Sequence, residues 1–321
     1  MVEAGSERDS PGVTTGCRAG DDTFTPHYLA AKKGVDDRAL NRHAWDTLVR
    51  SLPETTVGEA ARVLEIGAGI GTMVERAVEW GLLEGAGLYL ATDQEAGHLQ
   101  AARHRLRDWA TARGASWCWE SEERGRLRGA GGELTLVLKR ASAEELAERP
   151  PPSPPFHLLI AHALLDLVDF TALLPQLFPL LTPRGVLYLT CNFDGETIFL
   201  PGYPWDEERE IIRRYHASME QRLPGSSHCG RRLLAFLQGQ GLEILAAGAS
   251  DWVVHPRGGG YAGEEGPFLH AMVDTVEREL SKKAPPPGLS AWAETRRRQI
   301  EAGGLTFMAR HLDILARLGG P

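Results

Sequence analysis

The chain has 321 residues, 42% of them hydrophobic and 24% charged, a composition typical of a soluble globular protein. Its formal net charge is −8, whereas proteins that bind nucleic acid usually carry a basic surplus for contacts with phosphate. The composition therefore argues against DNA or bulk RNA as a partner. Apolar runs are short, and the longest carries a histidine and an aspartate, so we expect no membrane span.

Four cysteines are scattered along the sequence, and none forms a C-x-x-C pair. This usage predicts a reducing compartment, hence a cytoplasmic location, and no metal site. Residues 1–22 are polar and rich in glycine, without the basic start and apolar run of a signal peptide. We expect them to form a flexible tail.

The first half of the chain alternates helical and strand patterns. A helical cap is expected over 23–60, where Leu40, Ala44, Leu48 and Leu52 have helical spacing. The stretch "ARVLEI" predicts a buried strand and "TMVERAVEWG" the helix after it. "GLYLATD" predicts a second strand ending at Asp93, followed by a helix that ends near Gly114.

The second half continues the alternation after a charged excursion over 116–132, which we expect to be a hairpin. Strands are predicted at "ELTLVLKR", "FHLLIAHALL" and "TPRGVLYLTCNF", with a short helix at "SAEELAER" and a proline-kinked helix at "FTALLPQLFPLL". "RRLLAFLQGQGLEILAAGAS" predicts a helix and a sixth strand, and "GLTFMARHLDIL" a final antiparallel strand at the end of the sheet. The pattern predicts a doubly wound α/β core over 61–321 with insertions at about 192–230 and 251–303.

Three alternating glycines, Gly67, Gly69 and Gly71, stand where the first strand passes into its helix. Glycine permits a tight turn there and lets backbone N–H groups approach a ligand. The dinucleotide fingerprint G-x-G-x-x-G would require a glycine where this chain has Thr72. A dinucleotide site is therefore disfavoured, although it and a turn that binds nothing stay open as alternatives.

With Glu65, these glycines give "EIGAGIG", and this stretch resembles the first motif of the class I S-adenosylmethionine (SAM)-dependent methyltransferases, E-x-G-x-G-x-G. The resemblance extends from about Arg62 to Asn192 and more loosely to the sixth and last strands. It implies a Rossmann-like, mostly parallel seven-stranded sheet with an antiparallel last strand, helical lid insertions, and SAM as the cofactor.

The same resemblance assigns candidate cofactor residues. Asp93 would accept hydrogen bonds from the ribose hydroxyls, and Gln94 would extend contacts toward the adenine. The turn itself contributes Glu65, Gly67, Ala68, Gly69 and Gly71. Ser142 and Ala143 stand where the family often has Asp-Ala near the adenine amino group; alternatively, Ser142 caps the helix that follows.

Methyl transfer requires a base only when the acceptor must lose a proton. His162, at the end of the fourth strand, is the best-placed candidate and would lie near the transferring methyl group, although a core histidine is an equal reading. Asp194 and His216 are further candidate bases. Tyr28 and Arg42 are weaker candidates for contact with the cofactor carboxylate. A metal-assisted reaction would need Asp166, Asn192 and Asp194 to converge on one cation, and we expect no metal.

Aromatic residues gather in the two insertions. Phe193, Tyr203, Trp205 and Trp252 are expected to wall a flat or cationic acceptor, with ordinary packing as the alternative. The sequence thus predicts methyl transfer to an O, N or S atom of a small-molecule acceptor. A protein or RNA methyltransferase and a non-catalytic SAM-binding regulator stay open, as does a homodimer.

Overall fold

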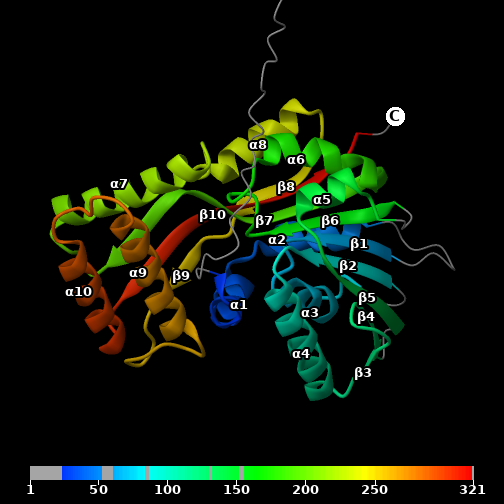
Figure 1. Cartoon of the computed structure of the whole chain (residues 1–321), viewed down its shortest axis with the longest axis horizontal. Helices are drawn as coiled ribbons and strands as arrows, with labels where there is room; N and C mark the ends of the chain where they lie inside the picture. Colours follow the sequence, from blue (N-terminus) through cyan, green and yellow to red (C-terminus); the bar gives the residue numbers. More distant parts are fainter. Residues whose placement is uncertain (1–23, 53–60, 84–86, 130–131, 152–154, 320–321) are drawn as a thin grey trace, which may run out of the picture.

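In the computed structural model, the described residues are 24–52, 61–83, 87–129, 132–151 and 155–319, so the tail predicted over 1–22 lies outside them. Ten strands form one sheet, with helices on both faces (Figure 1). The strands are β1 (Ala61–Ile66), β2 (Gly87–Asp93), β3 (Ser116–Trp119), β4 (Arg124–Gly129), β5 (Gly132–Arg140), β6 (Phe156–His162), β7 (Leu181–Leu200), β8 (Glu243–Ala249), β9 (Trp252–Val254) and β10 (Thr306–Arg317).

Their order across the sheet is β3-β4-β5-β2-β1-β6-β7-β10-β8, and β9 pairs with β10 beside β8. The five central strands, β5 to β7 in this order, are parallel, and β10 is antiparallel to both of its main neighbours. The order reverses between β1 and β6, and such a reversal opens a crevice at the carboxyl ends of the strands. The predicted fold class is therefore confirmed. The antiparallel pair β3 and β4 forms the hairpin expected over 116–132, and β9 is a further strand beyond the seven expected.

The helices are α1 (Pro26–Ala39), α2 (Arg42–Ser51), α3 (Thr72–Glu79), α4 (Ala96–Ala112), α5 (Ala143–Glu148), α6 (Phe170–Leu177), the 3₁₀ turn η2 (Phe178–Leu180), α7 (Trp205–Arg222), α8 (Cys229–Gly239), α9 (Glu265–Ser281) and α10 (Leu289–Glu301). One apolar core joins α2, α3 and α4 to one face of the sheet, and a second joins α5, α6 and α8 to the other. Within the described residues, no helix has the length and apolar character needed to cross a membrane.

A third core lies beyond the central sheet, where β7 and β10 extend together past the end of β6 (Figure 1). It packs α1, α7, α9, α10 and β9 against the far half of these two strands. Both predicted insertions contribute to it, so segments far apart in the sequence form one unit. Phe199, Trp292 and Phe307 meet there edge to face or tilted, with centroids 5.1 to 5.3 Å apart.

Three expectations about the elements need correction. The final strand, β10, does not lie at the end of the sheet but between β7 and β8. The fifth predicted strand is far longer than expected, because β7 continues through the start of the first insertion to Leu200. The helical pattern before the first strand belongs to two helices, since the chain turns at Leu40 and Asn41 caps α2.

Candidate functional site

The glycine turn joins β1 to α3 at the carboxyl edge of the sheet. Gly67, Gly69 and Gly71 have φ angles of +66°, +54° and +79°, which a residue with a side chain adopts only under strain. The sequence thus has glycine where the backbone requires it. The turn is closed by the Gly71 N–H, which donates to the carbonyl of Ala68 over 3.0 Å.

The carboxylate of Asp93 lies beside this turn, at the end of the neighbouring strand. Its Oδ2 accepts a 2.8 Å hydrogen bond from the backbone N–H of Gly69. Its Oδ1 accepts from the N–H of Glu95 at 2.9 Å and lies 3.1 Å from Nδ1 of His98. The expected pairing of glycine turn and acid is therefore built by β1 and β2, and Asp93 is only 7% exposed.

His98 is a contributor that the sequence reading missed. Its Nε2 lies 2.7 Å from the carbonyl oxygen of Phe24, just before α1. Both of its neighbours, a carboxylate and a carbonyl, can only accept, so the imidazole is best satisfied when it carries two protons. The hydrogen bond to Asp93 raises the pKa of His98 accordingly. His98 thereby ties the start of α1 to Asp93.

The helix α1 lies against the site, between α9 and β9 on one side and α3 and α4 on the other (Figure 1). It begins at Thr25, whose hydroxyl accepts from the N–H of Tyr28, and has Pro26 at its first position. A Cβ placed on Gly69 would lie 3.2 Å from Cδ1 of Leu29 in α1. The side of the turn that a ligand would approach is thus in contact with the protein itself.

A cluster of charged groups is buried at the far end of α1. Asp36 is 2% exposed, and its Oδ2 accepts from Lys32 Nζ at 2.7 Å and lies 3.8 Å from Arg76 NH2. Its Oδ1 accepts from Nε1 of Trp252 at 3.0 Å. Burial alone would raise the pKa of Asp36, but Lys32, His162 and Arg76 together hold it well below its usual range. We call these five residues the Asp36 cluster.

His162 joins this cluster from the end of β6. Its Nε2 lies 3.0 Å from Asp36 Oδ2 and its Nδ1 2.9 Å from the hydroxyl of Thr190. A carboxylate only accepts, so Nε2 carries the proton and Nδ1 accepts from Thr190. Burial lowers the pKa of His162 to about 4, although Asp36 acts in the opposite direction. The imidazole is therefore neutral near pH 7, with both nitrogens engaged.

The groups Asp36, His162 and Cys191 lie close enough for their donor atoms to face one cation. However, Lys32 and Arg76 already balance the charge of Asp36. Burial also raises the pKa of the Cys191 thiol well above its ordinary value, which disfavours the thiolate that a metal needs. The cluster is thus an ion-pair network by its chemistry. The Cys191 side chain is only 2% exposed.

Comparisons with known proteins bear on the fold. No family model matches the chain, and no curated protein does. Among solved structures, phosphoethanolamine N-methyltransferase 2 of Haemonchus contortus is similar at 13% identity and a TM-score of 0.44, over 94% of this chain but only 59% of that one. Geranyl diphosphate methyltransferase is similar at 12% identity and a TM-score of 0.40, over 86% of this chain and 76% of that one. Mycolic acid cyclopropane synthase was crystallised with S-adenosylhomocysteine (SAH). It is similar at 9% identity and a TM-score of 0.42, over 85% of this chain and 82% of that one.

The chain has a Rossmann-like, doubly wound α/β fold. Its strand order, its antiparallel β10 and the glycine turn facing Asp93 define this fold. The chain spans about three fifths of the Haemonchus protein. Activity and substrate consequently have to be argued from this chain's own residues.

The other predicted cofactor residues also have partners within the protein. Glu65 is 1% exposed and accepts from the hydroxyl of Tyr89 over 2.7 Å, below the turn. Ser142 makes a capping box with Glu145 at the start of α5, so the helix-cap alternative describes its contacts. Gln94 is exposed, and its carbonyl accepts from Arg140. Ala143 is the first residue of α5 and is buried.

The further candidate bases are also engaged. Asp194 is 4% exposed and accepts from the backbone N–H and the guanidinium of Arg231. His216 Nε2 lies 3.0 Å from the hydroxyl of Thr197, and burial lowers the pKa of His216 to about 4. Both carboxylate oxygens of Asp194 are therefore engaged, as is Nε2 of His216.

The four candidate acceptor residues separate into two groups. Phe193 and Trp252 are buried, and each packs on His311, with ring centroids 5.8 and 4.2 Å apart. Tyr203 is half-buried beneath the guanidinium of Arg296, whereas Trp205 is 74% exposed at the start of α7. Phe193 is thus linked through His311 to Trp252, a member of the Asp36 cluster, whereas Trp205 lies on the surface.

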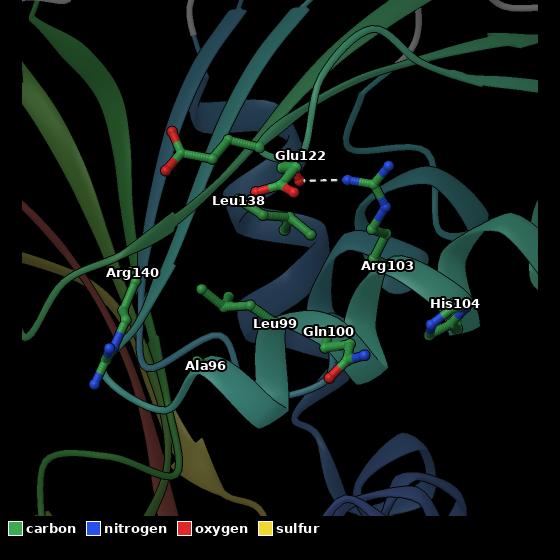
Figure 2. Close-up of a pocket in the computed structure, with 9 residues that line it drawn as sticks. Ala96, Leu99, Gln100, Arg103, His104, Glu122, Leu138 and Arg140 are labelled. Atoms are coloured by element: carbon green, nitrogen blue, oxygen red, sulfur yellow. Dashed lines mark hydrogen bonds between the residues drawn. The ribbon is translucent and has the colours of Figure 1, made fainter.

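A pocket of about 460 Å³ lies elsewhere, between α4, β5 and the turn after β3 (Figure 2). Leu99 and Leu138 face one another across it, and Arg103 donates to the carbonyl of Glu122 at its rim. Most of its polar side chains are exposed and of mixed charge. It therefore has few of the converging, buried polar groups that mark a specific site.

Proposed function

We propose that the chain is a SAM-dependent methyltransferase that acts on a small-molecule acceptor. One observation carries the proposal: the left-handed glycine turn after β1 directly faces the carboxylate at the end of β2, with Gly69 N 2.8 Å from Asp93 Oδ2. Turn and acid come from adjacent parallel strands, at the edge where such sheets bind ligands.

The residues present fit SAM once α1 is displaced. Asp93 offers a carboxylate whose two oxygens suit the two hydroxyls of a ribose. Gly69 has no Cβ to cover its left-handed backbone, and the side-chain atom nearest to where a Cβ would lie is the flexible end of Leu29. SAM would supply a methyl group already activated by the positive charge on its sulfur. The protein's remaining tasks are to orient the acceptor and exclude water.

His162 is the side chain best placed to take a proton from an acceptor. It stands at the carboxyl end of β6, and Asp36, which comes from α1, holds its Nε2. Withdrawal of α1 would free this nitrogen at the same edge of the sheet as the glycine turn. In the other tautomer Nδ1–H donates to the Thr190 hydroxyl, and Nε2 then accepts the proton. We expect His162→Gln to lower the turnover number at least tenfold with little change in SAH affinity. Equal turnover in the variant would remove His162 from the mechanism.

A small acceptor is favoured over a nucleic acid because the basic stretches are already neutralised. The arginines of β4, at positions 124, 126 and 128, pair with Glu120 and Glu133. Arg297 pairs with Asp274 and Glu277. Paired arginines offer little attraction to a phosphate backbone.

A non-catalytic SAM-binding regulator is the second candidate, favoured by the contact of α1 with the turn. Binding is tested by differential scanning fluorimetry with SAH and with NAD. SAH should raise the melting temperature and NAD should leave it unchanged. A rise with NAD alone would refute the assignment. Transfer of labelled methyl groups from SAM to a panel of amines, alcohols and thiols then separates the enzyme from the regulator.

A further inference from the structure

We propose that α1 is a self-inhibitory lid: it occupies the approach to the cofactor crevice, and the cofactor binds only after α1 has moved off the glycine turn. This inference rests on the proposed function and adds a gating step to it.

The first argument is that the protein's own atoms already use the groups expected to bind the cofactor. Gly69 N donates to Asp93, and both oxygens of Asp93 are engaged. A Cβ on Gly67 would lie 2.9 Å from Cδ1 of Leu164, and one on Gly69 would lie 3.2 Å from Leu29. A ligand that approaches this backbone must displace both leucines.

The second argument is that α1 is tied down at both ends by polar contacts. At its start, His98 links the carbonyl of Phe24 to Asp93. At its far end, Asp36 is held by Lys32, His162, Trp252 and Arg76. The first tie uses Asp93 and the second uses His162, so the two ties occupy a proposed cofactor group and a proposed catalytic group at once.

The third argument concerns what α1 buries. Its buried side chains are Ala31, Lys32, Val35 and Asp36, so half of them are charged. A permanently docked helix would be held better by apolar residues, because the desolvation of buried ions offsets much of their attraction. Ala31 and Val35 belong to the third core, whereas Lys32 and Asp36 recover hydration when the helix moves away, and this offsets part of the lost attraction. This composition suits a helix that docks reversibly.

The lid is tested first without any ligand, by hydrogen–deuterium exchange of the amides of α1. In Asp36→Asn the amides of residues 29–39 should exchange at least about tenfold faster than in the wild type. Leu29→Ala should also speed exchange, and it keeps every ion pair if Asp36→Asn folds poorly. The matched controls are Asp46→Asn, an exposed carboxylate in α2, and Leu99→Ala, a half-buried leucine in α4.

SAH binding by isothermal titration calorimetry follows on the same proteins. If the open form is a minor population, loosening α1 should tighten SAH binding by about the factor by which that population grows. Unchanged exchange of α1 in both lid variants would overturn the lid. So would weaker or equal SAH binding in variants whose α1 exchanges faster. Failure of every form to bind SAH, with α1 loosened, would instead overturn the proposed function.

Discussion

Gly69 is the residue on which most of the site depends, because its backbone is left-handed and its N–H faces Asp93. A valine there would be strained by about 1–2 kcal/mol and would press on Leu29. We expect Gly69→Val to abolish SAH binding in a calorimetric titration and to lower the free energy of unfolding.

The matched control is Gly97→Val, since Gly97 lies in α4 with nothing within 4 Å of an added Cβ. That variant should bind SAH as the wild type does. Normal SAH affinity in Gly69→Val would show that the turn has another role.

Glu65 gives a prediction about pH. Burial raises the pKa of Glu65 to about 8, despite the hydrogen bond from Tyr89. Between its ordinary pKa and about 8 the folded protein holds a proton that the unfolded chain releases, so this group destabilises the fold as pH rises through that window. The slope is at most about 1.4 kcal/mol per pH unit.

Glu65→Gln removes this proton exchange. In urea unfolding at pH 5, 6, 7 and 8, the free energy of unfolding of the variant minus that of the wild type should therefore increase as pH rises. Parallel curves would contradict the assignment. Glu148→Gln, at an exposed carboxylate, serves as the control and should run parallel to the wild type.

At the scale of single residues, the sequence predicted the turn and its acid but missed the Asp36 cluster. Glycine and a strand-end aspartate have a local signature, because strand and helix boundaries place them. Asp36 has none: Lys32 and Asp36 have the i, i+4 spacing typical of a solvated helix face. Only the packing of α1 against β6 and β9 turns that pair into a buried network.

At the scale of elements, the strand and helix alternation was predictable, whereas lengths and neighbours were not. The period of apolar residues located β1, β2, β5 and β6 closely. The sequence did not predict that β7 continues to Leu200. The stretch "FDGETIFL" is held as a strand by its pairing with β10, which lies far along the chain. Pairing between segments so far apart in the chain produces no recognisable pattern within a short stretch of sequence.

The helix α5 gives a prediction at this scale. The Ser142 hydroxyl accepts from Glu145 N at 3.1 Å, and the Glu145 side chain accepts from Ser142 N at 2.9 Å. Removing such a cap costs about 1 kcal/mol. We therefore expect Ser142→Ala to destabilise the protein by this amount in urea unfolding, while Ser142→Asp, which can also cap, retains stability. A loss of SAH affinity in the alanine variant beyond its stability loss would restore Ser142 to the adenine side.

At the scale of the whole molecule, the central sheet and the insertion core share two strands. β7 and β10 pair from Val186 with Arg317 at one end to Leu200 with Thr306 at the other. We expect unfolding in urea to occur in one transition, with coincident midpoints by circular dichroism and by tryptophan fluorescence, because neither core can lose these strands alone. Separate midpoints would show that the insertion core unfolds independently.

The shared pair β7–β10 also limits how this protein can be re-engineered. Transplanting the insertion core from another protein would have to exchange the distal half of β7 and the proximal half of β10 together, since each supplies the backbone partners of the other. A graft of either sequence insertion by itself would leave a ladder of unmatched amide and carbonyl groups in the interior. Chimaeras of this protein should therefore be cut at paired positions on both strands rather than at the ends of the insertions.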